Sequence, residues 1–354
     1  MTDGDALILC EGRFGATDGK TAHGLVRFTR RYRVRGVIDS HLAGRDAGEA
    51  LDGRPRGVPI VSSLEEGLLL PGPPVTHLVI GVATVGGRLP AELRPTIAAA
   101  LARGIHVDSG LHEFLGEDPE LMRAAAGSGA VIRDVRRPAP RSELHFYTGK
   151  ISEVECPKIA VLGTDCATGK RTTAWLLVSA LERAGLRAEM VGTGQTAWMQ
   201  GVRYGTLLDS IVNDFVTGEI EHAVWRAWKG ARPQAIVIEG QGTLIHPAYP
   251  GGFEILGAAS PEAVVLQHAP GRKHLEGFPG VPVAPPALHI EVIRLISGCP
   301  TIAITMSREG MEPSRYGAAA ESLARETDRA VFDPLADEGA ALAALVIERF
   351  GLRP

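Results

Sequence analysis

Short apolar runs alternate with helical or polar segments along the first half of the chain. Six such runs occupy residues 6–10, 34–39, 58–61, 77–82, 105–108 and 130–132. Before the fifth run, residues 91–103 carry apolar side chains at helical spacing, which is typical of a helix that crosses over a sheet. Strands that alternate with helices form parallel sheets. The pattern therefore predicts a Rossmann-like parallel-sheet domain over residues 1–137.

The second half of the chain repeats this alternation. Its apolar runs occupy residues 158–162, 188–191, 235–238, 263–267 and 301–306. Proline and arginine are concentrated between residues 136 and 141, which indicates a linker. We place the linker at residues 138–150 and predict a P-loop NTPase-like α/β domain over residues 151–354. The Ala-, Leu- and Glu-rich tail, residues 317–350, is interrupted at Asp333-Pro334 and predicts two covering helices.

The segment that follows the run at 158–162 predicts a phosphate-binding loop. Its turn is bounded by two glycines, and a lysine opens the next helix, so backbone N–H groups and an ammonium face one anion. Compared with the Walker pattern, the loop has one extra residue, and Arg171 replaces the usual Mg²⁺-binding hydroxyl, which Thr172 could supply instead. We predict a phosphate that is held, not cleaved. The assigned residues are Gly163, Thr164, Asp165, Cys166, Ala167, Thr168, Gly169, Lys170, Arg171 and Thr172.

Two further polar loops follow the runs at 188–191 and 235–238. Loops at the carboxyl ends of parallel strands converge, so all three loops should line one site. We assign Thr193, Gly194 and Gln195 to cofactor binding. Glu239, directly at a strand end, is the first candidate for a catalytic base, and the alternative is an acid that only stabilises the fold. His246 is the second candidate base, although a lone histidine is more often structural. Gln241 is a candidate hydrogen-bond donor to an oxyanion.

Other polar positions are candidates for substrate binding. The segment 267–274 ends a strand with cations and imidazoles that suit a carboxylate or phosphate, and an exposed turn is the alternative. Asp209 and Asn213 stand four residues apart, which predicts one helix face that is either a ligand wall or solvated. Cys166 lies at a helix N-terminus, and a structural role is preferred over a covalent one. The substrate-binding candidates are Arg203, Asp214, Tyr249, His268, Arg272 and Lys273.

Composition narrows the function classes. The 354 residues carry a formal net charge of −4 with dispersed basic residues, which excludes an electrostatic footprint for nucleic acid. No apolar run approaches a membrane span and the first residues lack a basic signal region, so we expect a cytoplasmic protein. The four cysteines match neither a metal knuckle nor a disulfide framework, and no metal is assigned. Residues 10–15 lack a convincing dinucleotide fingerprint, so nicotinamide binding has little support.

Taken with its neighbours, the phosphate loop resembles that of a known family. Residues 164–173, 193–196, 213–215, 239–242 and 246–249 are similar to the two-domain P-loop family that contains the D-glutamate N-acetyltransferases. Residues 38–40 and 42–46 resemble its N-terminal half, and dethiobiotin synthetases share the loop more distantly. The resemblance implies acetyl transfer from acetyl-CoA to the amine of D-glutamate or a related amino acid. Glu239 or His246 would then deprotonate the ammonium, Gln195 or Gln241 would stabilise the oxyanion, and Arg272, Lys273 or Arg203 would hold carboxylates.

Two other functions stay open at the level of sequence. An ATP- and Mg²⁺-dependent ligase or kinase acting on a small carboxylic acid would use Lys170 on the phosphates, with Thr172 and Glu239 around the metal. Arg171 argues against it. A non-catalytic nucleotide-sensing module would bind without turnover, and the density of polar groups after three strands argues against that. The small-molecule substrate's identity and chirality stay open, and a homo-oligomer is expected from size and class alone.

Overall fold

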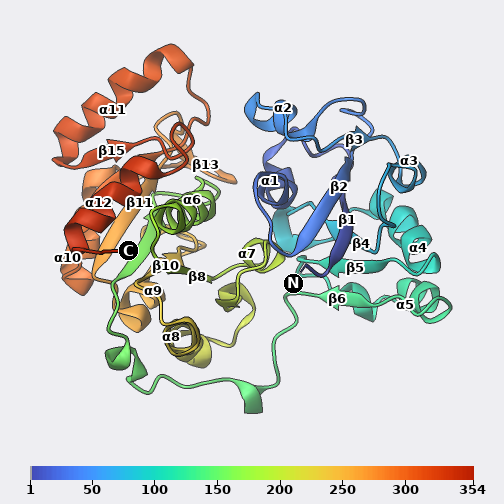
Figure 1. Ribbon diagram of the computed structural model, residues 1–354, viewed down its shortest axis with the longest axis horizontal. Helices are drawn as coiled ribbons and strands as arrows, with labels where there is room; N and C mark the ends of the chain where they lie inside the picture. Colours follow the sequence, from blue (N-terminus) through green and yellow to red (C-terminus); the bar gives the residue numbers. More distant parts are fainter. Residues whose placement is uncertain (1) are drawn as a thin grey trace. The chain divides into compact units, whose positions relative to one another are not determined.

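The chain folds into two compact units, each built around its own parallel sheet (Figure 1). This computed structural model describes residues 2–354. The N-terminal unit contains the residues up to Pro138 together with Gln195–Val202, and the C-terminal unit contains Ala139–Gly194 and Arg203–Pro354. The chain therefore passes from one unit to the other at three points. No helix in residues 2–354 is both long and apolar enough to cross a membrane.

The N-terminal sheet has the strand order β3-β2-β1-β4-β5-β6, which is the doubly wound order of Rossmann-like folds. Each of the six predicted runs overlaps a strand, the sixth at Ile132 alone, and the predicted crossover helix is present. Buried aliphatic side chains of β1 and β4 form the middle of the core. The elements are β1 (Gly4–Leu9), α1 (Lys20–Arg27), β2 (Tyr32–Ile38), α2 (Ala47–Asp52), β3 (Ile60–Val61), α3 (Leu64–Leu68), β4 (His77–Ile80), α4 (Arg94–Ala102), β5 (His106–Ser109), α5 (Pro119–Ala126) and β6 (Ile132–Asp134).

A helix from the second half of the sequence packs in the N-terminal unit. In α7 (Gln195–Met199), Thr196 Oγ1 lies 3.1 Å from Thr21 Oγ1, and Met199 is fully buried in the N-terminal core. The Gln200 amide donates to two carbonyl oxygens at the end of α1, at 2.8 and 2.9 Å. Because this segment directly follows Gly194, one predicted site loop continues straight into the N-terminal unit.

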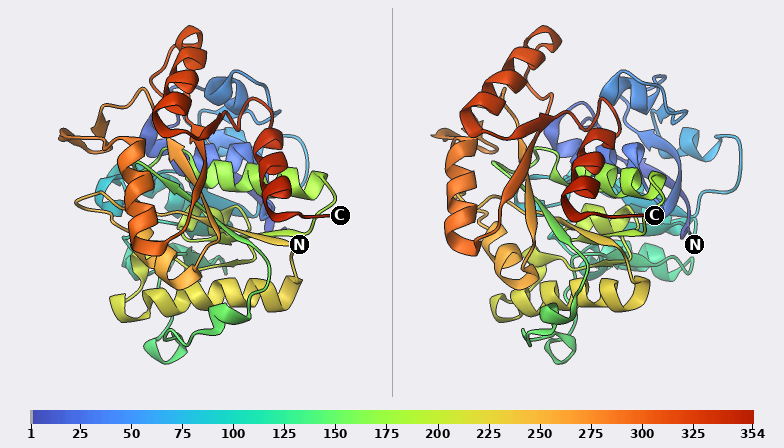
Figure 2. Two further views of the ribbon diagram at one scale, coloured as in Figure 1. Left: turned by 90° about the vertical axis from the view of Figure 1, so that its left-hand side faces the viewer. Right: turned by 60° about the vertical axis from the view of Figure 1, so that its left-hand side comes forward.

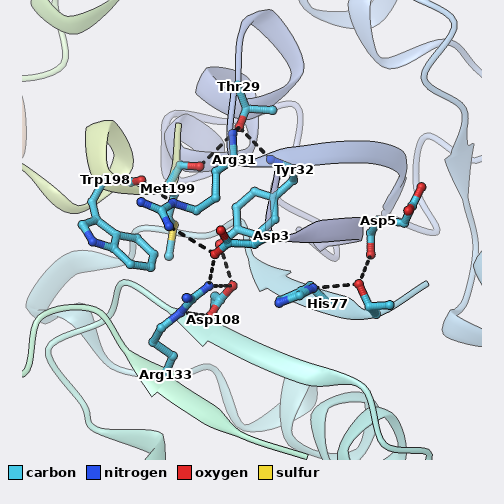
Figure 3. Close-up of polar contacts among 11 residues, drawn as sticks. Asp3, Asp5, Thr29, Arg31, Tyr32, His77, Asp108, Arg133, Trp198 and Met199 are labelled. Atoms are coloured by element: carbon cyan, nitrogen blue, oxygen red, sulfur yellow. Dashed lines mark hydrogen bonds and ion pairs between the residues drawn. The ribbon is translucent and has the colours of Figure 1, made fainter. Parts of the chain in front are cut away.

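A partly buried cluster of charged and aromatic side chains holds α7 against the N-terminal sheet (Figure 3). Arg31 Nε donates to the Trp198 carbonyl at 2.8 Å, and its guanidinium lies 3.8 Å from the centroid of the indole ring. The Tyr32 hydroxyl donates to Asp108 at 2.5 Å, and Arg133 donates to the same carboxylate at 2.6 and 2.8 Å. Burial, and then the Asp108 charge, raise the pKa of Tyr32 far above its usual range. The phenol therefore stays protonated and acts as a donor.

The C-terminal sheet has the strand order β15-β14-β11-β7-β10-β8-β9. The five predicted runs form its inner strands, whereas the short edge strands β9 and β15 and a separate hairpin were not predicted. Helices α6 and α12 pack together on one face, and α8, α9 and α10 cover the other (Figure 2). The strands are β7 (Lys158–Gly163), β8 (Ala188–Gly192), β9 (Tyr204–Gly205), β10 (Ala235–Glu239), β11 (Ala263–His268), β12 (His274–Leu275), β13 (Phe278–Pro282), β14 (Thr301–Met306) and β15 (Ala330–Phe332).

The helices of the C-terminal unit differ from the sequence predictions at two places. The tail forms two helices as predicted, but β15 lies between them. Asp209 lies in a short 3-10 turn and Asn213 begins α8, with Val212 extended between them, so the prediction of one shared helix face is wrong.

The helices of the C-terminal unit are α6 (Lys170–Arg183), α8 (Asn213–Ala231), α9 (Gly252–Ala259), α10 (Pro286–Ser297), α11 (Pro313–Thr327) and α12 (Ala340–Phe350). Short 3-10 turns are Thr17–Gly19, Val85–Gly87, Ala91–Leu93, Leu115–Glu117, Arg141–Glu143, Lys150–Glu153 and Leu208–Ser210.

Candidate phosphate-binding site

The phosphate loop joins the central strand β7 to α6. Gly169 has a φ of +108°, a conformation that side chains with a Cβ rarely adopt, and it caps the N-terminus of α6. A Cβ on Gly163 would lie 2.9 Å from Lys170 Cδ, so this glycine leaves room for the lysine to fold back over the strand end. The first amides of α6 lack partners within the helix and can bind an anion. The local structure is that of an anion cradle.

Asp165 holds the loop in shape. Its carboxylate is fully buried and accepts hydrogen bonds from the amides of Cys166 and Glu276, at 2.6 and 2.8 Å. Arg272 donates to the same carboxylate at 2.7 Å and to the Cys166 carbonyl at 2.6 Å. The other guanidinium nitrogen contacts both carboxylate oxygens of Glu309, at 2.6 and 2.7 Å. Arg272 therefore supports the loop, and these contacts favour that role over the substrate-binding role predicted for it.

The Lys170 ammonium is buried at the centre of the loop. Its Nζ donates to the Asp165 carbonyl at 2.6 Å. Burial lowers the pKa of Lys170, while the negative charges of Asp165 and Glu239 partly oppose that shift. A buried cation is stabilised strongly by an added counter-charge. An anion in the loop would supply that charge.

Glu239 ends β10, the strand next to β7, and brings the three predicted loops together. Its Oε2 accepts the Thr193 amide at 2.9 Å, and the Gln241 amide donates to the Thr193 carbonyl at 3.0 Å. Burial raises the pKa of Glu239, against the opposing charges of Arg171 and Lys170. The predicted convergence of these loops is thus present within the C-terminal unit.

The hydrogen bonds of His246 fix its tautomer. Its Nδ1 accepts the amides of Ala248 and Tyr249, both at 3.1 Å, so in the neutral ring the proton is on Nε2. Nε2 is buried, has no hydrogen-bond partner among residues 2–354, and lies 3.7 Å from Asp165 Oδ1. Burial lowers the pKa of His246. The geometry favours a neutral hydrogen-bond donor over the base predicted from sequence.

Asp165, Cys166 and His246 also place their potential ligand atoms within 4.8 Å of one another. A metal-bound histidine normally donates its other ring N–H to an acceptor. Here Nδ1 is itself the acceptor of two amides, so Nε2 has no free lone pair in the neutral ring. These contacts do not fit a metal site.

Two more buried imidazoles line the region. His268 Nδ1 lies 2.9 Å from the Thr164 hydroxyl, and His289 Nδ1 lies 3.4 Å from the Thr243 hydroxyl. Burial lowers the pKa of each to about 4, so both are neutral at pH 7. Sequence reasoning missed His289, which comes from a helix, and Glu309, which follows β14. Glu309 could have been found from the sequence, because it is an acid just after a predicted strand and therefore lies at the same edge of the sheet as the phosphate loop.

Of the remaining predicted residues, Tyr249 lies beside His246, and the others lie away from these contacts. Arg203 is exposed and pairs with Glu189 at 2.9 Å, and Gln195 accepts a hydrogen bond from Arg136 at 2.9 Å in the N-terminal unit. Asp214 and Lys273 are exposed. The Tyr249 ring is half-exposed, with its centroid 5.0 Å from that of His246. Of the substrate candidates, the structure brings Tyr249, His268 and Arg272 to the loop region.

The two-domain fold is found in known proteins. Residues 145–343 match a domain of unknown function, the DUF1611 P-loop domain, and residues 40–138 match the DUF1611 Rossmann-like domain. A crystal structure of a DUF1611 family protein from Anabaena variabilis matches over 97% of this chain and 99% of that chain, with a TM-score of 0.86 and 29% identity. The two-domain α/β architecture is therefore that of the family.

Two curated relatives have a named activity. Proteins from Tritonibacter scottomollicae and Pseudoalteromonas sp are named D-glutamate N-acetyltransferase, and each is 31% identical to this chain, over 210 and 205 residues. The matches cover 57% and 56% of this chain, and 59% and 58% of the relatives. The aligned part is thus less than two thirds of either relative.

Proposed function

We propose that this chain, which belongs to the DUF1611 family, is an N-acetyltransferase that moves the acetyl group of acetyl-CoA to the amine of D-glutamate or a related amino acid. The names of the two relatives support this activity at the level of the family. The observation that carries the proposal is the anion cradle around Lys170, with Arg171 where Walker loops place their metal-binding hydroxyl. Such a loop suits a ligand whose phosphate is bound without being transferred.

In this proposal the loop holds a phosphate of coenzyme A. The amides at the start of α6, Lys170 and Arg171 face the anion, and the phosphate replaces the Asp165 carbonyl as the partner of the ammonium. Asp165 and Arg272 keep the turn in the required shape through their buried contacts. The site thereby selects acetyl-CoA by its phosphate end.

The reaction at the other end of the ligand is direct transfer. The substrate ammonium gives one proton to water, and the neutral amine attacks the thioester carbon. The carbon–sulfur bond then breaks, and the departing sulfur of coenzyme A takes up the second proton that the nitrogen loses, which leaves the N-acetyl amino acid and the free thiol of coenzyme A. The long pantetheine arm separates this carbon from the phosphates. Glu239 and His246 both lie at the loop. If a phosphate binds beside Lys170, neither side chain can reach the thioester carbon of the same acetyl-CoA molecule, so neither acts as the base there. We therefore assign Glu239 to the charge balance of the loop.

The activity itself is tested by mass spectrometry of the product. The purified protein is incubated with acetyl-CoA and D-glutamate, with L-glutamate as the matched control for chirality, and in parallel with D-glutamate and Mg-ATP. The proposal predicts that D-glutamate gains one acetyl group and that coenzyme A is released in equal amount. Release of ADP without an acetylated product would instead establish the ATP-dependent ligase or kinase.

A further inference from the structure

Several large apolar side chains of α10 in the C-terminal unit are exposed. His289 and Ile293 point inward and are buried, whereas Leu288, Leu295 and Ile296 are 42%, 66% and 45% exposed. We use the name α10 patch for Leu288, Val292, Leu295 and Ile296 of α10 together with Phe253 of α9, which is 42% exposed.

The α10 patch continues into a groove between the two helices. The groove has a volume of about 310 Å³, and its lining is mixed: Phe253, Leu256, Pro261 and Ile296 are apolar, whereas Ser260 and Ser297 are polar. Exposed apolar side chains that lie together beside polar residues are typical of protein–protein interaction sites. The side of α10 away from the groove carries Glu291 and Arg294, which are both exposed and form no ion pair with any of residues 2–354.

We propose that the α10 patch binds a second copy of this chain, with α10 packed antiparallel against its own copy about a twofold axis at the level between Val292 and Ile293. Residues whose numbers are equally spaced around this midpoint then lie opposite each other. Leu288 of each copy comes within one position of Ile296 of the other, so the start of one α10 lies over the groove of its partner. A twofold interface is self-complementary in this way.

The charges of α10 support a second copy over an unrelated partner. Glu291 and Arg294 lie on the same side of the apolar stripe and on either side of its midpoint. In an antiparallel twofold pair the same sides of the two helices meet, so Glu291 of each copy faces Arg294 of the other. Two equivalent ion pairs then close over one edge of the apolar contact. The proposal is independent of the proposed enzymatic activity.

The first experiment measures the molar mass of the full chain in solution by size-exclusion chromatography with light scattering. The wild type should elute as a dimer, and Leu295→Glu should elute as a monomer because a charge would be buried in the contact. Leu69→Glu is the matched control, since Leu69 is 84% exposed in the N-terminal unit. A monomeric wild type, or a Leu295→Glu variant that stays dimeric, overturns the proposal.

Charge exchange tests the antiparallel geometry itself. Glu291→Arg alone and Arg294→Glu alone each place like charges opposite one another, and each should raise the dimer dissociation constant at least about tenfold. An equal mixture of the two variants should form heterodimers with wild-type affinity, because every facing pair is then of opposite charge. Circular dichroism checks that both variants are folded. A mixture that associates no better than the separate variants contradicts this geometry.

Discussion

Glu239 is the residue whose role depends most on where acetyl-CoA binds. With a phosphate beside Lys170, the Glu239→Gln substitution removes a neighbouring carboxylate and leaves the reacting carbon untouched. We expect kcat to stay within about threefold of wild type and acetyl-CoA to bind up to about tenfold more tightly, a change of about 1.4 kcal/mol. Steady-state kinetics together with calorimetric titration measure both quantities.

The opposite result would identify Glu239 as the base. Loss of a general base typically lowers the rate by about 10²–10⁴-fold. Such a loss in kcat with unchanged affinity for acetyl-CoA would mean that the thioester, and not a phosphate, lies at the loop.

The sequence identified most residues of the candidate site but not their chemical roles. His246 was recognised as an imidazole near the loop, but its tautomer depends on a turn that brings two amides onto Nδ1. Arg272 was recognised as a cation after a strand. Its partners Asp165 and Glu309 are far away in sequence, so its role in holding the loop could be seen only in the folded chain.

Among the secondary-structure elements, the loop between β7 and α6 depends on its support by Arg272. Arg272→Ala would leave the Asp165 carboxylate buried without its cation, and breaking such a pair typically costs about 3–5 kcal/mol. We expect at least tenfold weaker binding of acetyl-CoA, by about 1.4 kcal/mol or more. Titration calorimetry measures the affinity, and thermal unfolding measures the loss of stability.

Arg308→Ala is the control for this prediction. Arg308 forms an ion pair with Asp333 at 2.6 Å, but its side chain is half-exposed, and such pairs contribute only about 0–1 kcal/mol. The Arg308→Ala variant should bind acetyl-CoA with the affinity of the wild type. If Arg272→Ala bound acetyl-CoA normally and only raised KM for D-glutamate, Arg272 would hold the substrate carboxylate as the sequence suggested.

Long, buried strands could be predicted from the sequence, whereas short strands at the edge of a sheet could not. The inner strands are apolar and buried on both faces, so their runs were evident in the sequence. The edge strands β9 and β15 contain two and three residues, too few for a periodic pattern. The helix α7 follows β8 directly in sequence, and only the side chains that it buries against α1 assign it to the N-terminal unit.

At the scale of the whole molecule, buried neutral histidines should make stability depend on pH. The pKa values of His268 and His289 are lowered to about 4, and that of His246 is lowered as well. An unfolded histidine takes up its proton near pH 6.5. The unfolded chain therefore binds more protons between about pH 6.5 and 4, and the free energy of unfolding falls as pH decreases through this range.

The expected loss is about 3 kcal/mol for each of His268 and His289 over the full range, since one pKa unit corresponds to 1.36 kcal/mol. Denaturant titrations at several pH values, followed by the fluorescence of the buried Trp175 and Trp228, measure it. In His289→Asn the unfolded chain takes up one proton fewer over this range, so the free energy of unfolding should fall less steeply as the pH decreases. Stability that stays constant from pH 7 to pH 5 would show that these imidazoles are not buried as described.

The most direct test of the central claim is a calorimetric titration of wild type and Lys170→Met with acetyl-CoA. Methionine keeps much of the length of lysine and removes the charge, and Lys229→Met, at an exposed pair with Glu153, serves as the control. The account predicts that Lys170→Met binds at least about tenfold more weakly, because a charge-assisted contact to the phosphate is lost, and that the control binds as wild type. Equal affinity of Lys170→Met and wild type would contradict the assignment of the loop to a phosphate of acetyl-CoA.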